Sequence, residues 1–544
     1  MTSAARGAPP AQGPAADPAT PDARAEPAPP SATSEPGTSA RQAASATPGM
    51  GGVARGSTAN LAGAFVMAAA NLVLSVAVTR GLPREAAGIF FSATSLFLLA
   101  TTVGQLGTNT GLVYFLARCR SLGQTGAIPA YFRAALRPVL VTATLMAILL
   151  YLLAPQIAGV TTPHHVAETT RYLRVLALFI PFVGLENVAL AATRGLGSMR
   201  VNATVEQLAR PVLQVLLVVG AISFSGSALL SWAWVFAYLP AGVAAYLWWR
   251  RMLPPAVTPS EPPAQAARVG REFWRFSSPR ALASVGQIAM QRLDIVLVGA
   301  LAGVVNAAIY TAATRFLVVG QMGQRAISLA VQPRLGEALA QKDTSSTNHY
   351  YQISTAWLML VTWPLYCTLI VFGEPLLSVF GKGYNAGIAV LVVLSCSMLI
   401  GTGCGMVDMV LTMAGRTSWN LYNVATALAV NLGLDLWLIP THGVLGASIG
   451  WAVAIVVANV VPLAQVGLVM GLHPFGRPST LAALLSLGCY GGVEVVLRQG
   501  FGASWLALLA ALVIATLAYG AGLWHFREAL YLTVLRERRK RARR

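Results

Sequence analysis

Polar side chains recur at helical spacing inside two long apolar segments of this chain. One row repeats every fourth residue and consists of Asn202, Glu206, Arg210 and Gln214. A second row consists of Gln321, Arg325, Ser328 and Gln332, with Arg315 and Gln324 close by. Residues three or four positions apart share one face of a helix. Each row therefore predicts a polar stripe along an otherwise apolar helix.

The segment QIAMQRLDIVLVG, residues 287–299, carries polar side chains of the same kind. Gln287, Gln291 and Asp294 are expected to share one helical face. Arg292 is rotated by about 160° from Asp294 at the ordinary helical pitch. We therefore expect this helix to contact both a cavity and a partner helix.

Two interpretations account for ionisable groups inside apolar helices. Each group costs about 2.5–3.5 kcal/mol on membrane insertion, so it usually faces a cavity or a partner. One interpretation is pairing between side chains, for example of Glu206 with Arg210, or of Asp294 with an arginine. The other is an anionic ligand, because several arginines lack matching acids and guanidinium groups bind phosphate in bidentate fashion. Glutamine and asparagine beside them suit the hydroxyl groups of a sugar.

The helices that position these residues must cross a membrane. Hydrophobic residues make up 56% of the 544 positions and charged residues only 10%, whereas about 25% charged residues is usual for soluble proteins. Apolar runs of about 20 residues, enough for one crossing, recur from residue 59 onward. We predict an all-α polytopic membrane protein with about 14 transmembrane helices, centred near Ala69, Leu96, Ala143, Phe182, Leu213, Phe236, Met290, Val318, Leu360, Leu399, Ala427, Val456, Ser486 and Ala511. Glycine or proline interrupts several of them, at Gly104, Gly107, Pro181, Gly184, Pro211 and Pro364.

The loops predict the orientation and account for the net charge. Lysine and arginine are concentrated in alternate loops, which places both termini in the cytoplasm by the positive-inside rule. We therefore expect a multi-pass protein of the cytoplasmic (inner) membrane. The same asymmetry explains most of the net charge of +19, so nucleic-acid binding is not indicated. The basic tail RERRKRARR (536–544) predicts contact with membrane lipids. The 5 cysteines lack the spacing of a disulfide framework or a metal site, and no cofactor is expected.

The first half of the chain is weakly similar to the second. An offset of 218 to 220 residues aligns GIFFSAT (88–94) with AIYTAAT (308–314), and GSMRVN (197–202) with GRTSWN (415–420). We predict two six-helix lobes related as parallel repeats. The predicted organisation is a disordered cytoplasmic tail (1–57), an N-lobe with spans 1–6 (58–252), a cytoplasmic crossover linker (253–272), a C-lobe with spans 7–12 (273–470), spans 13 and 14 (471–526), and a basic cytoplasmic tail (527–544).

Four segments share their order and spacing with a known family of transporters. They are RGLPREAAGIFFSATSLFLLATTVGQLGTNTGLVYFLAR (80–118), QRLDIVLVGALAGVVNAAIYTAATR (291–315), LLSVFGKGYNAGIAVLVVLS (376–395) and NLGLDLWLIPTHGVLGASIGWA (431–452). Together they resemble the polysaccharide and oligosaccharide-lipid flippases, the polysaccharide transport branch of the multidrug/oligosaccharidyl-lipid/polysaccharide exporter superfamily. The resemblance covers nearly all of residues 58–470.

The resemblance implies a V-shaped transporter and not an enzyme. Such a flippase moves a polyprenyl-pyrophosphate-linked oligosaccharide from the inner to the outer leaflet for cell-surface polysaccharide biosynthesis, by alternating access. The sugar and pyrophosphate would pass through a cationic cavity, while the lipid tail stays in the bilayer. A glycan polymerase or glycosyltransferases are the protein partners that this role implies.

Depth and helical face select the candidate site residues. The predicted substrate-binding residues are Arg80, Arg210, Gln291, Arg292, Arg315, Gln321 and Arg325. The arginines would hold the pyrophosphate, with Arg80 at one mouth of the cavity. Glu206, Asp294 and Asp408 are the predicted coupling or gating residues. No catalytic or metal-binding residue is expected.

Other functions stay open at this point. A lipid II flippase of peptidoglycan synthesis would share the fourteen spans and the cationic cavity. Arginines disfavour a multidrug or cation antiporter, although Glu186 and Asp408 are compatible with one. A membrane-embedded polysaccharide polymerase or polyprenyl-phosphate glycosyltransferase needs acids or histidines in an aqueous loop, and the largest internal loops offer only His164, His165, Glu168, Glu261 and Glu272. A scaffold for a glycan-synthesis complex would leave the arginines without a role.

Overall fold

The computed structural model describes residues 50–227, 229–253 and 263–532 of the chain, where every regular element is helical. The chain divides into the units Met1–Met50 and Gly51–Arg544, and the fold described below is that of the second unit. Most of the predicted N-terminal tail, residues 254–262 of the crossover linker and the RERRKRARR tail lie outside the described residues. Helix α2 begins at Met50, so residues 50–57 of the predicted tail are helical.

The helices up to residue 252 form the N-terminal bundle. They are α2 (Met50–Gly81), α3 (Arg84–Gln105), α4 (Thr108–Ser121), η1 (Thr125–Ala127), α5 (Ile128–Leu152), α6 (Ala154–Thr161), η2 (Pro163–His165), α7 (Val166–Ala177), α8 (Ile180–Gly195), η3 (Asn202–Ala209), α9 (Arg210–Ser225), α10 (Leu230–Phe236) and α11 (Tyr238–Met252). Helices α3, α4, α5 and α11 all pack against α8.

The C-terminal bundle comprises α13–α19 and is followed by a final group of helices. The elements are α13 (Val304–Ala340), α14 (Thr344–Val371), α15 (Gly373–Ser378), η4 (Tyr384–Gly387), α16 (Ile388–Gly403), α17 (Val407–Met413), α18 (Thr417–His442) and α19 (Val444–Met470), then α20 (Arg477–Ser486), η5 (Leu487–Gly492), α21 (Val493–Phe501) and α22 (Trp505–His525). Helix α14 packs against α13 and α16 within the bundle and against α20 outside it.

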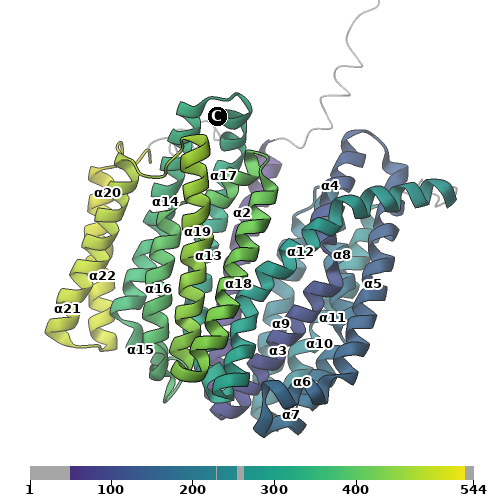
Figure 1. The fold of residues 1–544 in the computed structure, drawn as a ribbon, viewed down its shortest axis with the longest axis horizontal. Helices are drawn as coiled ribbons and strands as arrows, with labels where there is room; N and C mark the ends of the chain where they lie inside the picture. The colour runs from purple at the N-terminus through teal and green to yellow at the C-terminus, as the bar shows by residue number, and fades with distance from the viewer. Residues whose placement is uncertain (1–49, 228, 254–262, 533–544) are drawn as a thin grey trace, which may run out of the picture. The chain divides into compact units, whose positions relative to one another are not determined.

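Helix α12 (Pro263–Ala302) connects the two bundles. It is 40 residues long and includes residues 263–272 of the predicted linker. It packs against α3, α4 and α5 of the N-terminal bundle and against α13 and α18 of the C-terminal bundle, as Figure 1 shows. One continuous helix therefore carries residues that face both bundles.

The described helices account for most of the predicted membrane spans. Twelve helical segments are long and apolar enough to cross a membrane, or 13 if the pair Pro163–Ala177 and Ile180–Gly195, bent by 41°, is a single span. Thirteen of the 14 predicted centres fall in these segments, and the other, Val318, lies in α13. The protein is a multi-pass, all-α membrane protein. The number fourteen is not confirmed, because α13, which carries the second polar row, is not among the segments that are apolar enough.

Some of the predicted interruptions coincide with a break or a change of helix type. Leu106 and Gly107 adopt left-handed backbone conformations, with φ of 51° and 68°, and separate α3 from α4. The π-helix η3 ends just before Pro211, at the start of α9. Pro364 is different, because α14 continues through it from Thr344 to Val371. The expected break at Pro364 is therefore wrong: the helix accommodates the proline without ending.

Helix α3 is packed on both sides by the rest of the fold. It contacts α5, α7 and α8 in the N-terminal bundle, and α12 and α13 on its other side. Its buried face includes Phe90 and Phe97, and the Phe97 ring meets Trp234 edge-on at 5.6 Å. Close approach to α13 depends on Gly88, since a Cβ atom there would overlap the backbone carbonyl of Val304. A backbone group cannot rotate away as a flexible side chain can.

Gly88→Ala tests this contact between α3 and α13. We expect the stability of the protein to fall by about 1–3 kcal/mol, because the added methyl group overpacks a contact with backbone atoms. The measurement is the thermal unfolding midpoint of the purified protein in detergent. Gly220→Ala is the matched control, since nothing lies within 4 Å of a Cβ atom at this helical position. Equal midpoints for the two variants would contradict the close approach.

Candidate functional site

A cavity of about 260 Å³ lies between the two bundles, lined by residues of α2, α3, α9, α10, α11, α12 and α13. We call it the central cavity. Its polar lining consists of Asn71, Arg210, Gln214, Gln291, Arg292, Arg315, Gln321 and Arg325, with the hydroxyl of Tyr238. Four of these residues are arginines, and no carboxylate is among the described residues that line it. The structure thus brings together six of the seven predicted substrate-binding residues; their binding role stays a prediction.

Arg210 is the first residue of α9, and its side chain contacts Glu186 and Tyr238. Its guanidinium group lies 3.6 Å from a carboxylate oxygen of Glu186 on α8 and 4.8 Å from the centre of the Tyr238 ring. The Glu186 side chain is only 1% exposed, so this ion pair has little contact with solvent. Both contacts hold the arginine in place at the cavity wall.

Arg292 on α12 and Arg315 on α13 carry buried donors without partners. The Nε atoms of Arg210, Arg292 and Arg315 are buried and have no hydrogen-bond partner among the described residues. Arg315 lies over the Phe91 ring at 5.5 Å, and Arg292 repels it electrostatically. Buried polar groups are nearly always hydrogen-bonded, and an unsatisfied one costs about 1–3 kcal/mol. These Nε donors therefore remain available to an acceptor in the cavity.

Neutral amide groups complete the polar lining. Gln214 donates through Nε2 to the carbonyl oxygen of Trp234 at 3.1 Å, and Asn71 donates through Nδ2 to that of Met67 at 2.8 Å. An amide has both donors and an acceptor, so each group keeps its own oxygen as an acceptor. Such acceptors complement hydroxyl donors beside the cationic groups.

The first predicted polar row is not one stripe in the structure. Residues Asn202–Ala209 form the π-helix η3, in which each residue bonds to the fifth rather than the fourth along the chain. Of the four residues in the row, Arg210 and Gln214 line the central cavity, whereas Glu206 is not among the residues that line it. Arg210 pairs with Glu186 and not with Glu206.

Arg80 is not among the residues that line the central cavity, and its expected place at one mouth stays a prediction. Its guanidinium group donates to the carbonyl oxygens of Val379 at 2.6 Å and Ser378 at 3.2 Å. These contacts connect the end of α2 to the loop after α15. The sequence analysis selected Arg80 from its expected depth in the membrane. Its hydrogen-bond partners are backbone carbonyl groups at the end of α15, which the depth does not reveal.

Asp294 on α12 is buried and is not among the residues that line the central cavity. Its Oδ2 atom accepts a hydrogen bond from the Tyr310 hydroxyl at 2.8 Å. Asp435 on α18 is close enough to interact electrostatically with the Asp294 carboxyl group. Asn431 donates to Asp435 at 3.0 Å, while the other carboxylate oxygen of Asp435 is buried without a partner among the described residues. Two buried carboxyl groups thus share one site, which we call the carboxyl pair.

The polar face predicted for α12 is divided among three sites. Gln291 lines the central cavity together with Arg292, and Gln287 lines a second cavity. Asp294 is buried beside Tyr310 instead. Arg292 thus faces the central cavity and Asp294 does not, whereas Gln287 and Gln291 line successive cavities along the helix. The neighbouring helices decide which side of α12 each residue meets.

The second cavity has a volume of about 780 Å³ and is lined by α4, α12, α13, α17 and α18. Asp408 is exposed on its wall, together with Arg280, Ser284, Ser328 and Gln332. Along α12, residues 291 and 292 face the central cavity and residues 280, 284 and 287 face the second cavity. Along α13, residue 325 faces the central cavity and residues 328 and 332 face the second cavity. The two cavities therefore follow each other along both helices.

Several residues of these sites were not predicted from the sequence. Asn431 and Asp435 carried a usable signal, since two polar residues four positions apart interrupt the apolar segment NLGLDLWLIP. Trp234 and Tyr238 have the same spacing, but aromatic residues at that spacing usually belong to a core. Glu186 was considered only as an acid of a cation antiporter, because its partner Arg210 belongs to another helix.

Solved structures of transporters share this fold. The chain is similar to the lipid II flippase MurJ in an inward closed conformation, with a TM-score of 0.69 and 12% identity over 86% of this chain and 98% of that chain. It is also similar to an inward-facing multidrug resistance MATE family transporter of the MOP superfamily, with a TM-score of 0.60 and 15% identity over 73% and 92%. A MOP superfamily transporter from Pyrococcus furiosus aligns with a TM-score of 0.52 and 16% identity over 76% and 94%. At these identities the similarity establishes the fold.

Sequence profiles establish the family. The profile of the family described as Polysaccharide biosynthesis protein matches residues 53–339, more than half of the chain, and the MatE profile matches residues 279–437. No curated protein sequence matches significantly. The chain belongs to the Polysaccharide biosynthesis protein family, which confirms the family predicted from its motifs.

Glu186→Leu tests whether the buried acid holds Arg210. We expect a loss of stability of roughly 3 kcal/mol, because removing one member of a buried ion pair leaves the other charge uncompensated. The double variant Glu186→Leu/Arg210→Met should recover most of this loss. The measurement is the thermal unfolding midpoint in detergent, and Glu206→Leu on the neighbouring segment is the control. A double variant no more stable than Glu186→Leu would show that the pairing is unimportant.

Proposed function

We propose that this transporter moves a polyprenyl-pyrophosphate-linked oligosaccharide from the inner to the outer leaflet for cell-surface polysaccharide biosynthesis. The observation that carries the proposal is the charge of the central cavity. Four arginines and no carboxylate line it within the described residues, and three of the guanidinium groups have a buried Nε atom without a partner. A pyrophosphate group supplies several anionic acceptor oxygens, which guanidinium groups bind in bidentate fashion.

The sizes of the two cavities suit the two parts of the cargo head group. The central cavity, at about 260 Å³, is small enough to enclose a pyrophosphate with an adjoining sugar ring. The larger second cavity, at about 780 Å³, is lined by serine, threonine, asparagine and glutamine side chains that suit further sugars. We infer that the head group passes between them along α12 and α13 while the lipid tail stays in the bilayer.

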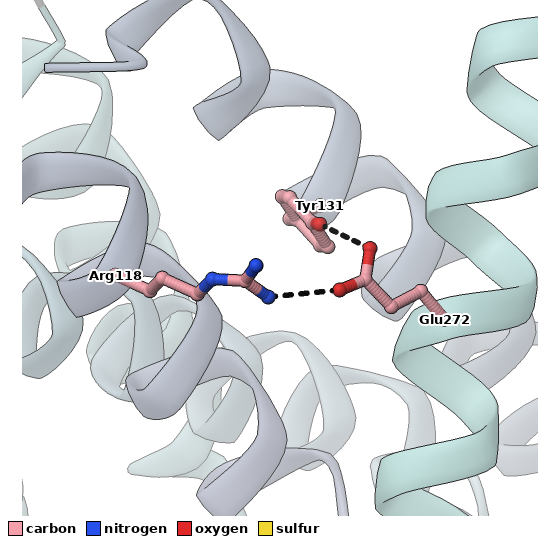
Figure 2. A network of polar contacts seen from close by, with 3 residues as sticks. All are labelled: Arg118, Tyr131 and Glu272. Carbon is pink, nitrogen blue, oxygen red and sulfur yellow. Dashed lines mark hydrogen bonds and ion pairs between the residues drawn. The ribbon is translucent and has the colours of Figure 1, made fainter. Parts of the chain in front are cut away.

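Alternating access would break contacts between the bundles at each end in turn. Arg80, just before α3, and Arg118, near the end of α4, lie at opposite ends of the span Arg84–Ser121. At one end, Arg80 bonds the loop after α15. At the other, Arg118 forms an ion pair with Glu272 of α12 at 2.9 Å, shown in Figure 2. We assign Arg80 to this opening and closing of the outer side instead of to cargo binding.

The carboxyl pair is our candidate for energy coupling. Asp294 and Asp435 approach each other in a buried site, where two negative charges repel strongly unless a proton or a cation lies between them. The pair adjoins α12, which also carries Arg292 into the central cavity. Uptake or release of a proton or a monovalent cation there would shift α12 and thereby the cavity. Glu206 and Asp408 contact neither carboxyl group in the described contacts.

The second candidate cargo is lipid II. Its head group also joins sugars to a polyprenyl pyrophosphate, so the arginine chemistry applies equally. The fold similarity to the lipid II flippase MurJ, at a TM-score of 0.69, supports lipid II as the second candidate. Cation antiport is disfavoured, because a cavity lined by four arginines repels an organic cation.

Arg292→Ala and Arg315→Ala, made singly, test the cargo site. We expect the translocation rate of a labelled polyprenyl-pyrophosphate oligosaccharide in proteoliposomes to fall about tenfold to a hundredfold, which corresponds to the loss of one charge-assisted hydrogen bond. Arg200→Ala, at an exposed position on the N-terminal bundle, is the matched control and should retain the wild-type rate. Wild-type rates in both cavity variants would exclude the central cavity as the path. Faster movement of lipid II than of the oligosaccharide by the unmodified protein would favour the second candidate.

Asp294→Asn and Asp435→Asn test the coupling site. We expect translocation to lose its dependence on an imposed proton or sodium gradient, because a neutral amide cannot hold the shared cation or proton. Binding of the cargo should stay within about threefold of the unmodified protein, since neither carboxyl group lines the central cavity. Transport is measured in proteoliposomes with and without each gradient, and Asp408→Asn is the comparison. A gradient dependence that persists in both variants would move the coupling site elsewhere.

A further inference from the structure

A basic pocket opens between α4 and the N-terminal part of α12, apart from both transport cavities. It has a volume of about 520 Å³, and we call it the α4–α12 pocket. Its lining includes Tyr114, Arg118, Arg268, Arg271, Arg275 and Phe276. None of its described lining residues also lines the central or the second cavity. The transport site therefore does not account for it.

The charge of the pocket is largely uncompensated. Arg268, Arg271 and Arg275 are three and four positions apart, so they lie on one face of α12, and all are exposed. The described residues offer these guanidinium groups no ion pair. Glu272, the one carboxylate among the described lining residues, is already held by Arg118 at 2.9 Å and by the Tyr131 hydroxyl at 3.0 Å (Figure 2). Four arginines and one glutamate leave the lining with a charge of 4 − 1 = +3.

Aromatic packing holds the walls of the pocket in position. Trp274 donates through Nε1 to the carbonyl oxygen of Ala134 on α5 at 3.1 Å, which fixes the start of α12 against the N-terminal bundle. The rings of Tyr114 and Phe276 stack at 4.6 Å across the floor, and Phe115 stacks on Tyr131 at 4.8 Å. The arginines therefore project from a packed framework, which lowers the entropy cost of binding.

The pocket lies at the level of a membrane surface. Arg118 is close to the end of the span Arg84–Ser121, and Arg268 to Arg275 precede the span Arg280–Ala302. Under the positive-inside prediction this surface is the cytoplasmic one. Exposed apolar surface adjoins the charge, since Tyr114 is 48% and Leu122 is 57% exposed. A ligand with an anionic head and an apolar body matches this combination.

We propose that the α4–α12 pocket binds the phosphate head group of an anionic phospholipid from the surrounding bilayer. Basic pockets between transmembrane helices on the cytoplasmic side bind such head groups, because each basic residue near the surface attracts the anionic lipid. The lipid phosphate lies among Arg268, Arg271 and Arg275, and its acyl chains run past Tyr114. Bound lipid then fastens the N-terminal part of α12 to α4, beside the Arg118–Glu272 ion pair that closes this end. The anionic lipid content of the membrane would thereby affect how readily the bundles separate.

The double variant Arg271→Gln/Arg275→Gln of the full-length chain tests the proposal. Native mass spectrometry during titration with phosphatidylglycerol should show binding weakened about tenfold or more, as expected for the loss of two basic residues. Arg271→Lys/Arg275→Lys keeps the charge and should bind within a few-fold of the unmodified protein. Arg137→Gln, an exposed arginine on α5 outside the pocket, is the matched control and should bind normally. The thermal midpoint without lipid establishes that each variant is folded.

Three outcomes would overturn the proposal. The first is unchanged phosphatidylglycerol binding in the glutamine double variant. The second is equal binding of phosphatidylcholine and phosphatidylglycerol by the unmodified protein, because a zwitterionic head group does not need the arginines. The third is loss of polyprenyl pyrophosphate binding with phosphatidylglycerol binding intact, which would make the pocket a capture site for the transported lipid. The first two outcomes leave the proposed transport function untouched, because the central cavity is not altered.

Discussion

The arrangement of the bundles depends on keeping uncompensated positive charge inside the membrane. Four arginines face a small cavity whose described lining has no carboxylate, and burial in a low-dielectric environment makes each of them costly. The fold offsets the cost of Arg210 with the buried Glu186 and with the Tyr238 ring, and it places the Phe91 ring under Arg315. The remaining donors are left for a ligand. The anionic cargo proposed above would supply the missing acceptors.

Helix α12 contributes residues to three sites, namely the α4–α12 pocket, the central cavity and the carboxyl pair. From its N-terminal part to its C-terminal part it carries the arginines of the α4–α12 pocket, then Arg292 of the central cavity, then Asp294 of the carboxyl pair. A continuous helix transmits a shift at one site to the others more directly than a loop does, because its backbone hydrogen bonds resist bending. Lipid binding, cargo binding and ion binding would therefore act on the same mechanical element.

The predictable part of the site followed from hydropathy and helical spacing. Thirteen of the 14 predicted centres coincide with apolar helical segments, and Val318 lies in α13, because a crossing helix needs about 20 apolar residues whatever surrounds it. The arginines of α12 and α13 stood out because arginine is rare within apolar segments. Glu206 is not among the residues that line the central cavity, and it lies in the π-helix η3, which the spacing did not predict. Nothing in the local sequence of NATVEQLA distinguishes that segment from an ordinary helix.

By itself, the sequence determined that the chain crosses a membrane many times, that it belongs to the Polysaccharide biosynthesis protein family, and that arginines lie within its apolar segments. These properties depend on composition, on motif order and on the local spacing of residues. Only the tertiary structure decided which side chains meet: Arg210 with Glu186, Asp294 with Tyr310 and Asp435, and Arg80 with the carbonyl groups after α15. Each of these contacts joins different helices, and their partners depend on how the helices are rotated and stacked. That rotation is set by the packing of the whole fold, which the spacing along one helix does not encode.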